Sequence, residues 1–253
     1  MTLLRTLFTF ATCTLLALAP TLTPTNALAA NTGILVVGGT GQLGSYHVNQ
    51  LSAAGERIIV LARPSSTFER LEGSTYEVVI ADLMDADAVK AAVMDAKPAV
   101  IIDVSNVPGI RMEDGDSFYW RSMRTLVAAA QEAGVTQIIR HSARGARQML
   151  TQPAAMFKDQ PQIINYLRDV ARAEIALETA SANSDLEYTI ILNSNLPPEP
   201  AIPTGNGALV DDLTVDLGIT RADLARITTP CILNPACYGK TLNAVDDTLA
   251  ERQ

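Results

Sequence analysis

The stretch Gly33-Ile34-Leu35-Val36-Val37-Gly38-Gly39-Thr40-Gly41-Gln42-Leu43-Gly44 decides how this chain folds. Its first five residues are an apolar run without alternation, which is typical of a strand buried on both faces in a parallel sheet. The run leads into glycines spaced G-x-x-G-x-x-G, and the residues that follow have helical character. A strand, a glycine loop and a helix in this order predict the opening unit of a doubly wound α/β fold.

The glycine loop predicts a binding site for the pyrophosphate of a dinucleotide. A pyrophosphate approaches the loop backbone closely only where Cβ atoms are absent, and the helix N-terminus adds free N–H groups and a positive dipole end. A tight turn that binds no ligand is the alternative interpretation. On the dinucleotide interpretation, the cofactor contacts Gly38, Thr40, Gly41, Gln42, Leu43 and Gly44.

Further apolar runs alternate with helical stretches along the chain. Strands are predicted at residues 57–62, 77–81, 99–104, 137–140, 188–192 and 239–245. Helices are predicted at residues 42–54, 86–96, 122–133, 166–180 and 220–232. This alternation predicts an α/β fold, a Rossmann-like doubly wound parallel sheet, with residues 197–253 as a small C-terminal lobe.

The end of the second predicted strand indicates which dinucleotide binds. A carboxylate there would bind the ribose 2′-hydroxyl of NAD, whereas an arginine accepts the 2′-phosphate of NADP. Arg63 stands there without a nearby carboxylate, and Ser65 and Ser66 add hydroxyl donors, so NADP is predicted and NAD is the second candidate. After the third strand, Asp82 and Leu83 are predicted to contact the adenine. Asp82 as a plain helix N-cap is the alternative.

These motifs together resemble the short-chain dehydrogenase/reductase superfamily, and most closely its atypical, NmrA-like branch of NAD(P)-binding proteins. The resemblance extends from about residue 34 to the C-terminus. It implies an oxidoreductase that binds NAD(P) and acts on a small-molecule substrate. The segments that carry it are the glycine loop, Arg63, Asp82-Leu83, Ala133-Gly134-Val135, Leu186-Glu187-Tyr188-Thr189-Ile190 and Ile219-Thr220-Arg221-Ala222-Asp223-Leu224-Ala225.

The catalytic pattern of that superfamily is incomplete in this chain. Its members usually combine a Tyr-x-x-x-Lys pair with a serine on the preceding strand, and the tyrosine donates a proton while the lysine lowers its pKa. The resemblance makes Tyr166 and Ser142 the candidate catalytic residues, with His141 as another proton donor, but Val170 occupies the lysine position. Arg168 is close in sequence but lies off the helix face of Tyr166.

Three functions are therefore compatible with the sequence. The first is NADPH-dependent reduction of a small electrophilic acceptor, such as a carbonyl, a quinone or an enone. The second is a redox sensor that binds dinucleotide without turnover, and the third is a scaffold or assembly protein that has lost the chemistry. We expect the first.

The first 29 residues are predicted to be a targeting sequence rather than a part of the fold. Arg5 is the only charge before Glu56, and an apolar run at residues 7–19 is too short to cross a bilayer. Ala27-Leu28-Ala29 then fits the A-x-A pattern of a cleavage site. We expect a signal peptide over residues 1–29, an exported and periplasmic protein without a membrane span after cleavage, and one domain over residues 30–253.

Composition narrows the class of partner. The chain has 253 residues, with 19 Lys and Arg against 27 Asp and Glu, and this net charge of −8 argues against nucleic acid as a partner. Two His and three Cys predict no metal site. If Cys13 leaves with the signal peptide, Cys231 and Cys237 remain, either as a disulfide or as two unrelated small hydrophobic residues.

Overall fold

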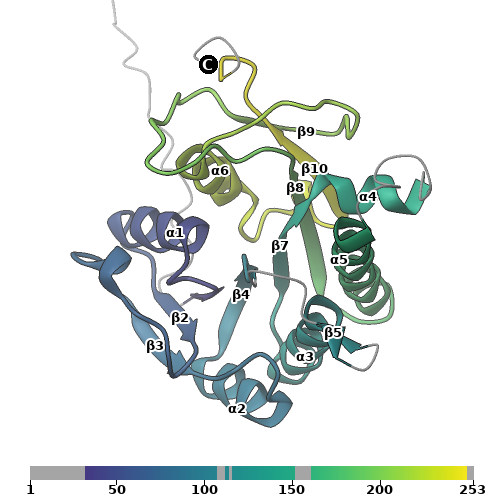
Figure 1. Cartoon of the computed structure of the whole chain (residues 1–253). Helices are drawn as coiled ribbons and strands as arrows, with labels where there is room; N and C mark the ends of the chain where they lie inside the picture. The colour runs from purple at the N-terminus through teal and green to yellow at the C-terminus, as the bar shows by residue number, and fades with distance from the viewer. Residues whose placement is uncertain (1–31, 107–111, 114–115, 152–160, 250–253) are drawn as a thin grey trace, which may run out of the picture. The chain divides into compact units, whose positions relative to one another are not determined.

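The computed structural model describes residues 32–106, 112–113, 116–151 and 161–249 (Figure 1). The predicted signal peptide lies outside these residues. In the described part of the chain, an eight-stranded sheet has the order β3-β2-β1-β4-β7-β8-β10-β9. Its strands are β1 (Gly33–Val37), β2 (Ile58–Ala62), β3 (Glu77–Ile80), β4 (Pro98–Asp103), β7 (Gln137–Ala143), β8 (Glu187–Asn193), β9 (Ala208–Val210) and β10 (Lys240–Val245).

The sheet is parallel except at one edge, where β9 runs antiparallel to β10. From β1 the chain first builds outward to β2 and β3, and then crosses back to place β4 on the other side of β1. This reversal between β1 and β4 is the topological switch point at which doubly wound folds bind their ligands. The predicted fold class is confirmed.

Helices cover both faces of the sheet (Figure 1). On one face, α1 (Gln42–Ala53) packs against α6 (Arg221–Thr228). On the other face, α3 (Phe118–Ala133) lies between α2 (Ala86–Ala96) and α5 (Pro161–Ser181). Outside these layers, α4 (Arg144–Thr151) packs against α5, and β5 (Met112–Glu113) pairs with β6 (Asp116–Ser117).

The two helical layers explain the apolar run of β1. Leu35 and Val37 belong to the hydrophobic cluster that β1 shares with α3 and α5, which contribute residues such as Leu126 and Leu177. Side chains of the intervening residues point to the α1 layer, because successive residues of a strand face opposite sides of the sheet. Both faces of β1 are thus dry, and an unbroken run of Ile, Leu and Val is the sequence that satisfies both.

The structure departs from the predicted boundaries where distant residues decide them. The third helix was predicted from residue 122, yet α3 begins at Phe118. Asp169 of α5 accepts hydrogen bonds from the backbone N–H groups of Tyr119 and Trp120 at 3.0 and 3.2 Å. A cap from another helix leaves no local signature at the start of α3. Similarly, the helix predicted over residues 220–232 is α6 followed by a 3₁₀ turn at Thr229–Cys231.

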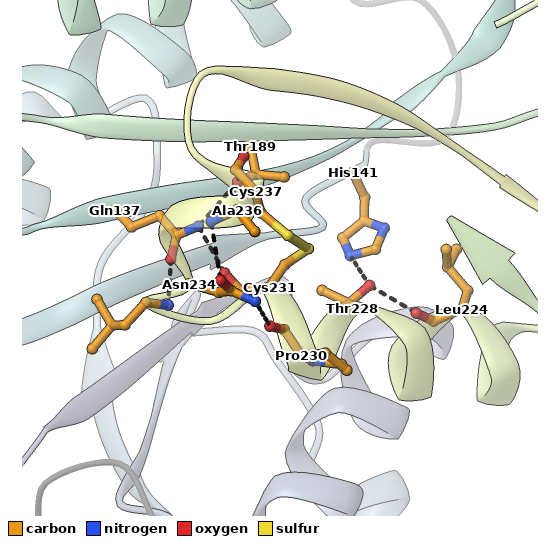
Figure 2. Close-up of a disulfide and its surroundings, with 11 residues drawn as sticks. Gln137, His141, Thr189, Leu224, Thr228, Pro230, Cys231, Asn234, Ala236 and Cys237 are labelled. Atoms are coloured by element: carbon orange, nitrogen blue, oxygen red, sulfur yellow. Dashed lines mark hydrogen bonds between the residues drawn. A yellow bond between two sulfur atoms is a disulfide. The ribbon is translucent and has the colours of Figure 1, made fainter. Parts of the chain in front are cut away.

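The residues predicted as a small C-terminal lobe are continuous with the main sheet, because β10 pairs with β8 and α6 packs against α1. Cys231 and Cys237 form a disulfide in this region (Figure 2). The closed loop is fixed to the sheet by Gln137, whose side-chain amide donates to the Cys231 carbonyl at 3.0 Å and accepts from the Leu233 N–H at 2.7 Å. Of the two interpretations of these cysteines, the structure has the disulfide.

Candidate functional site

A cavity of about 540 Å³ lies where the parallel strands around the switch point end. Its wall includes the ends of β1 and β2 on one side and those of β4, β7 and β8 on the other. Side chains of α5 and α6 complete it. This is the position at which an α/β sheet of this kind binds a dinucleotide.

The glycine loop forms one wall of the cavity, and all six residues predicted to contact the cofactor line it. Gly38 has φ +83°, a left-handed conformation that favours glycine. A Cβ atom on Gly44 would lie 2.1 Å from the Gly38 carbonyl oxygen, so only glycine fits there. The N-cap of α1 is Gly41, which offers no side-chain acceptor, and the first turn carries no acidic residue. The N–H groups at the start of α1 are therefore available to an anion.

The residues predicted to select the cofactor divide into two groups. Arg63 and Ser66 line the cavity, and they form a turn in which the Arg63 N–H donates to the Ser66 hydroxyl at 3.1 Å. Leu83 lines the cavity as well, but Asp82 does not. The Asp82 carboxylate instead accepts from the Met84 N–H at 2.9 Å, while Asp85 is the N-cap of α2. Arg63 therefore lies on the cavity wall and Asp82 lies outside the lining, while the N-cap of α2 is Asp85 rather than Asp82.

The charge of the cavity is opposite in sign to that of the chain. Three arginines line it, Arg63, Arg140 and Arg221, and in the part of the chain that the structure describes no carboxylate does. Arg221, the first residue of α6, donates to the Pro197 carbonyl at 2.6 Å and lies 3.5 Å from Glu199. A protein with a net charge of −8 thus presents cations to its cavity, which favours an anionic ligand.

Ser142 lies on the cavity wall, and its hydroxyl donates to the buried carboxylate of Glu174 on α5. Glu174 is also paired with Arg147 at 2.7 Å. Burial raises the pKa of Glu174, although Arg147 and the Ser142 hydroxyl act in the opposite direction. Because the Ser142 proton is directed away from the cavity, the oxygen of Ser142 is left as an acceptor on the cavity side.

Tyr166 also reaches the cavity, and the structure brings both candidate catalytic residues to the same site. Its ring packs edge-on against Tyr119 at 5.4 Å, and its hydroxyl has no hydrogen-bond partner among the described residues. Val170 is buried on the same wall, where the superfamily carries lysine. Arg172 lies over the Trp120 ring at 4.4 Å and does not line the cavity.

A buried ion pair that sequence reasoning missed supplies a cation to this region. Arg140 on β7 pairs with Asp103 at the end of β4 at 2.5 Å, and the side chains of both are less than 5% exposed. Arg140 lines the cavity, and its guanidinium lies 5.7 Å from the centre of the Tyr119 ring. The signal available in the sequence was a charged residue directly after Ile138-Ile139 in an otherwise apolar strand.

Two histidines lie together at the cavity, where His141 is part of the lining and His47 is not. The rings of His47 on α1 and His141 on β7 are 4.9 Å apart, and the His141 Nε2 is 3.3 Å from the Thr228 hydroxyl of α6 (Figure 2). Burial lowers the pKa of His47 to about 3. Burial also lowers the pKa of His141, as do His47 and Arg140. Both rings are therefore neutral near pH 7, and His141 brings no positive charge to the cavity.

The histidines predict how the stability of the protein depends on pH. An unfolded histidine binds a proton near pH 6.5, whereas the pKa of folded His47 is about 3, so the free energy of unfolding falls as the pH drops through this window. His47→Leu removes this linkage. Between pH 6.5 and 5, the free energy of unfolding of the variant should therefore fall by about 1.5 kcal/mol less than that of the wild type. Urea unfolding at a series of pH values measures the difference. Parallel curves for the two proteins would contradict the buried neutral state of His47.

The comparisons with known proteins agree with this geometry. Residues 38–235 match the NAD(P)H-binding family, and the chain belongs to it. A 3-diazoavenalumate denitrifying reductase from a Streptomyces species is 28% identical over 170 residues, which are 62% of this chain and 54% of that protein. The chain thus spans about half the length of that relative.

Two solved structures illustrate the likeness in fold. ChuY, an anaerobillin reductase from Escherichia coli O157:H7, has a TM-score of 0.67 and 20% identity over 85% of this chain and 98% of its own. A short-chain dehydrogenase/reductase from Veillonella parvula in complex with NADP has a TM-score of 0.65 and 16% identity over 85% of this chain and 95% of its own. At these identities the likeness concerns the fold.

In the part of the chain that the structure describes, no helix is both long enough and apolar enough to span a membrane. The His, Cys, Asp and Glu side chains of that part do not gather in groups of three or more suited to a metal ion.

Proposed function

We propose that this protein catalyses the NADPH-dependent reduction of a small electrophilic acceptor, such as a carbonyl, a quinone or an enone. The observation that carries the proposal is the single cavity that joins the glycine loop and Arg63 to Tyr166 and Ser142. A site that only bound dinucleotide would not need polar side chains from α5 and β7 beside it.

The residues present fit NADPH. The glycine loop leaves room for a pyrophosphate, the start of α1 offers N–H groups, and Arg63 with Ser66 offers donors to a 2′-phosphate. When bound, NADPH supplies a hydride. The NADP complex of the Veillonella parvula structure, which has the same fold, supports this choice of cofactor.

On the acceptor side, the chain contributes a proton donor and an apolar wall. Tyr166 has a hydroxyl without a partner among the described residues, and the apolar side chains of Val170, Phe118 and Leu196 line the same cavity. Tyr166 is therefore the group that protonates the reduced acceptor, and the Ser142 oxygen accepts a hydrogen bond from a donor group of the bound molecule. Reductase activity in the named relatives supports this class of reaction.

A second candidate function, dinucleotide binding without turnover, is favoured by one observation. Val170 stands at the lysine position, and among the described residues no arginine of α5 lines the cavity, so that helix brings no cation into the cavity. Both functions predict binding of NADPH. They differ in whether NADPH is consumed when an acceptor such as menadione is added.

The choice between cofactors depends on Arg63. Wild-type protein should bind NADPH at least about tenfold more tightly than NADH, because a charge-assisted hydrogen bond to a phosphate contributes about 1.5–3 kcal/mol. Arg63→Ala should remove the preference and leave the affinity for NADH unchanged. Fluorescence titration of the purified mature protein measures both affinities. Arg70→Ala is the matched control, since Arg70 is also exposed but does not line the cavity.

Absence of binding for both cofactors would overturn the proposed function. Equal affinities for NADPH and NADH in the wild type would overturn the role of Arg63 alone.

Proton donation depends on Tyr166. Tyr166→Phe should lower kcat for menadione about 100-fold, since a positioned general acid contributes that much or more, and should leave the affinity for NADPH unchanged. Steady-state oxidation of NADPH measures kcat. Tyr238→Phe is the control, because Tyr238 lies outside the cavity. A Tyr166→Phe variant with full activity would assign Tyr166 to packing against Tyr119.

We also propose that residues 1–29 direct export and that cleavage follows Ala29. The disulfide between Cys231 and Cys237 supports an oxidising compartment for the mature chain. Mass spectrometry of the protein from a periplasmic fraction should find an N-terminus at Ala30 and no free thiol. A full-length chain retained in the cytoplasm would contradict export.

A further inference from the structure

We propose that Arg140 binds the oxygen of the acceptor and receives the negative charge that develops there during reduction. The inference rests on the proposed function and goes beyond it. It gives Arg140, a residue of β7, the role of the cation that α5 does not supply. It applies to each of the proposed acceptors, because the reacting carbon of a carbonyl, a quinone or an enone is bonded to, or conjugated with, a carbonyl oxygen.

Within the described residues, the side-chain hydrogen bonds of Arg140 are all made by one nitrogen. Nη1 donates to Asp103 at 2.5 Å and to the carbonyl and hydroxyl oxygens of Ser105 at 3.4 Å each. Nε is buried and has no partner there. Nη2 makes no hydrogen bond with the described residues either. Arg140 thus has donors to spare, although its side chain is only 4% exposed.

Unused donors at this depth indicate a ligand. Leaving a buried N–H without an acceptor costs about 1–3 kcal/mol, and more for a charged group. Nε and Nη2 share one edge of the guanidinium plane, and such an edge matches an anionic oxygen or a carboxylate. Because Arg140 lines the cavity, an oxygen of a ligand held there can supply the missing acceptor.

The surroundings of Arg140 place it at the reacting end of the cavity. Its guanidinium lies over the Tyr119 ring, and the same ring packs edge-on against Tyr166. Ser142 lies two residues further along β7, so its side chain and that of Arg140 point to the same face of the sheet. A cation, the proton donor Tyr166 and the acceptor oxygen of Ser142 therefore line one part of the cavity.

The two other arginines of the cavity are accounted for differently. Arg63 stands at the end of β2, where the 2′-phosphate is expected. Arg221 comes from α6, and Glu199, which lies beside it, accepts a hydrogen bond from Tyr46 of α1 at 3.1 Å. Arg140 is thus the arginine that lies among the side chains expected to act on the acceptor.

The reaction balances with these groups. The acceptor carbon gains a hydrogen with its electron pair from the reduced nicotinamide, and the π pair of the carbonyl moves to oxygen, directly or through the conjugated double bond. The free N–H groups of Arg140 donate hydrogen bonds to that oxygen as it becomes negative. A proton from Tyr166 then neutralises it, and solvent returns the proton to Tyr166. One preorganised donor of this kind contributes about 10²–10³ to kcat.

Arg140→Lys tests this role without unpairing Asp103. The lysine ammonium can remain beside Asp103, but the second edge of donors is lost. We expect kcat for menadione to fall about 100-fold while the affinity for NADPH, measured by fluorescence, is unchanged. Arg57→Lys is the matched control: Arg57 is paired with Glu77 at 2.7 Å, it does not line the cavity, and its replacement should leave kcat unchanged.

A spectroscopic measurement separates charge stabilisation from structural support. The probe is para-nitrophenol bound to the protein with NADP⁺, because its ionised form absorbs at longer wavelength than its neutral form. Near Arg140 the bound dye should be more ionised than free dye at the same pH, and Arg140→Lys should abolish the increase. The double variant Arg140→Met, Asp103→Asn removes both charges and avoids an unpaired buried carboxylate, so it serves if the single variant unfolds.

The outcomes distinguish this inference from the proposed function. If NADPH binds and is consumed with menadione, but Arg140→Lys keeps full kcat or wild-type protein does not shift the dye, the role of Arg140 is wrong and the proposed function stands. If NADPH does not bind to the wild type, the proposed function itself is wrong. A lower kcat together with a lost dye shift would support both.

Discussion

The contact between Gly44 and the Gly38 carbonyl is the constraint on which the rest of the site depends. A Cβ atom at residue 44 would lie 2.1 Å from that oxygen, so this approach of α1 to the end of β1 requires glycine. The contact starts α1 directly at the edge of the sheet and keeps its first N–H groups on the cavity wall. Because β4 returns to the other side of β1, the same edge also receives the ends of β4 and β7, which carry Asp103 and Arg140.

Much of the fold follows from local sequence, and the exceptions have non-local causes. The apolar runs of β1 and β2 are each sufficient to predict a strand, because helices cover both faces of the sheet there. The start of α3 could not be predicted, since its cap is Asp169 from a helix some fifty residues away in sequence. Burial raises the pKa of Asp169, while the two backbone N–H groups that it accepts from favour its ionised form. Such a cap stabilises the start of α3 only when α3 and α5 are packed together.

The features of the site also divide into those that the local sequence predicts and those that it does not. The glycine loop and Arg63 were predictable because contiguous residues form them and the backbone conformation of each is set locally. The pairs Arg140–Asp103 and Ser142–Glu174 were not, because their members are 37 and 32 residues apart in sequence and meet only when β7 is in place. The sequence did show charges in apolar surroundings, and a buried charge requires a partner. It did not show which partner each one finds.

These pairs also explain how an acidic chain maintains a cationic cavity. Asp103 lies behind Arg140, Glu174 behind Ser142, and Glu199 beside Arg221, and none of the three carboxylates lines the cavity. Each carboxylate binds a residue of the cavity wall from the side that faces away from the cavity. The side of that residue that faces the cavity remains available to a ligand. The positive charge beside Ser142 is thereby carried by Arg140 of the sheet rather than by a residue of α5. The loss of the helix lysine at Val170 therefore changes the origin of the cation in this site rather than removing it.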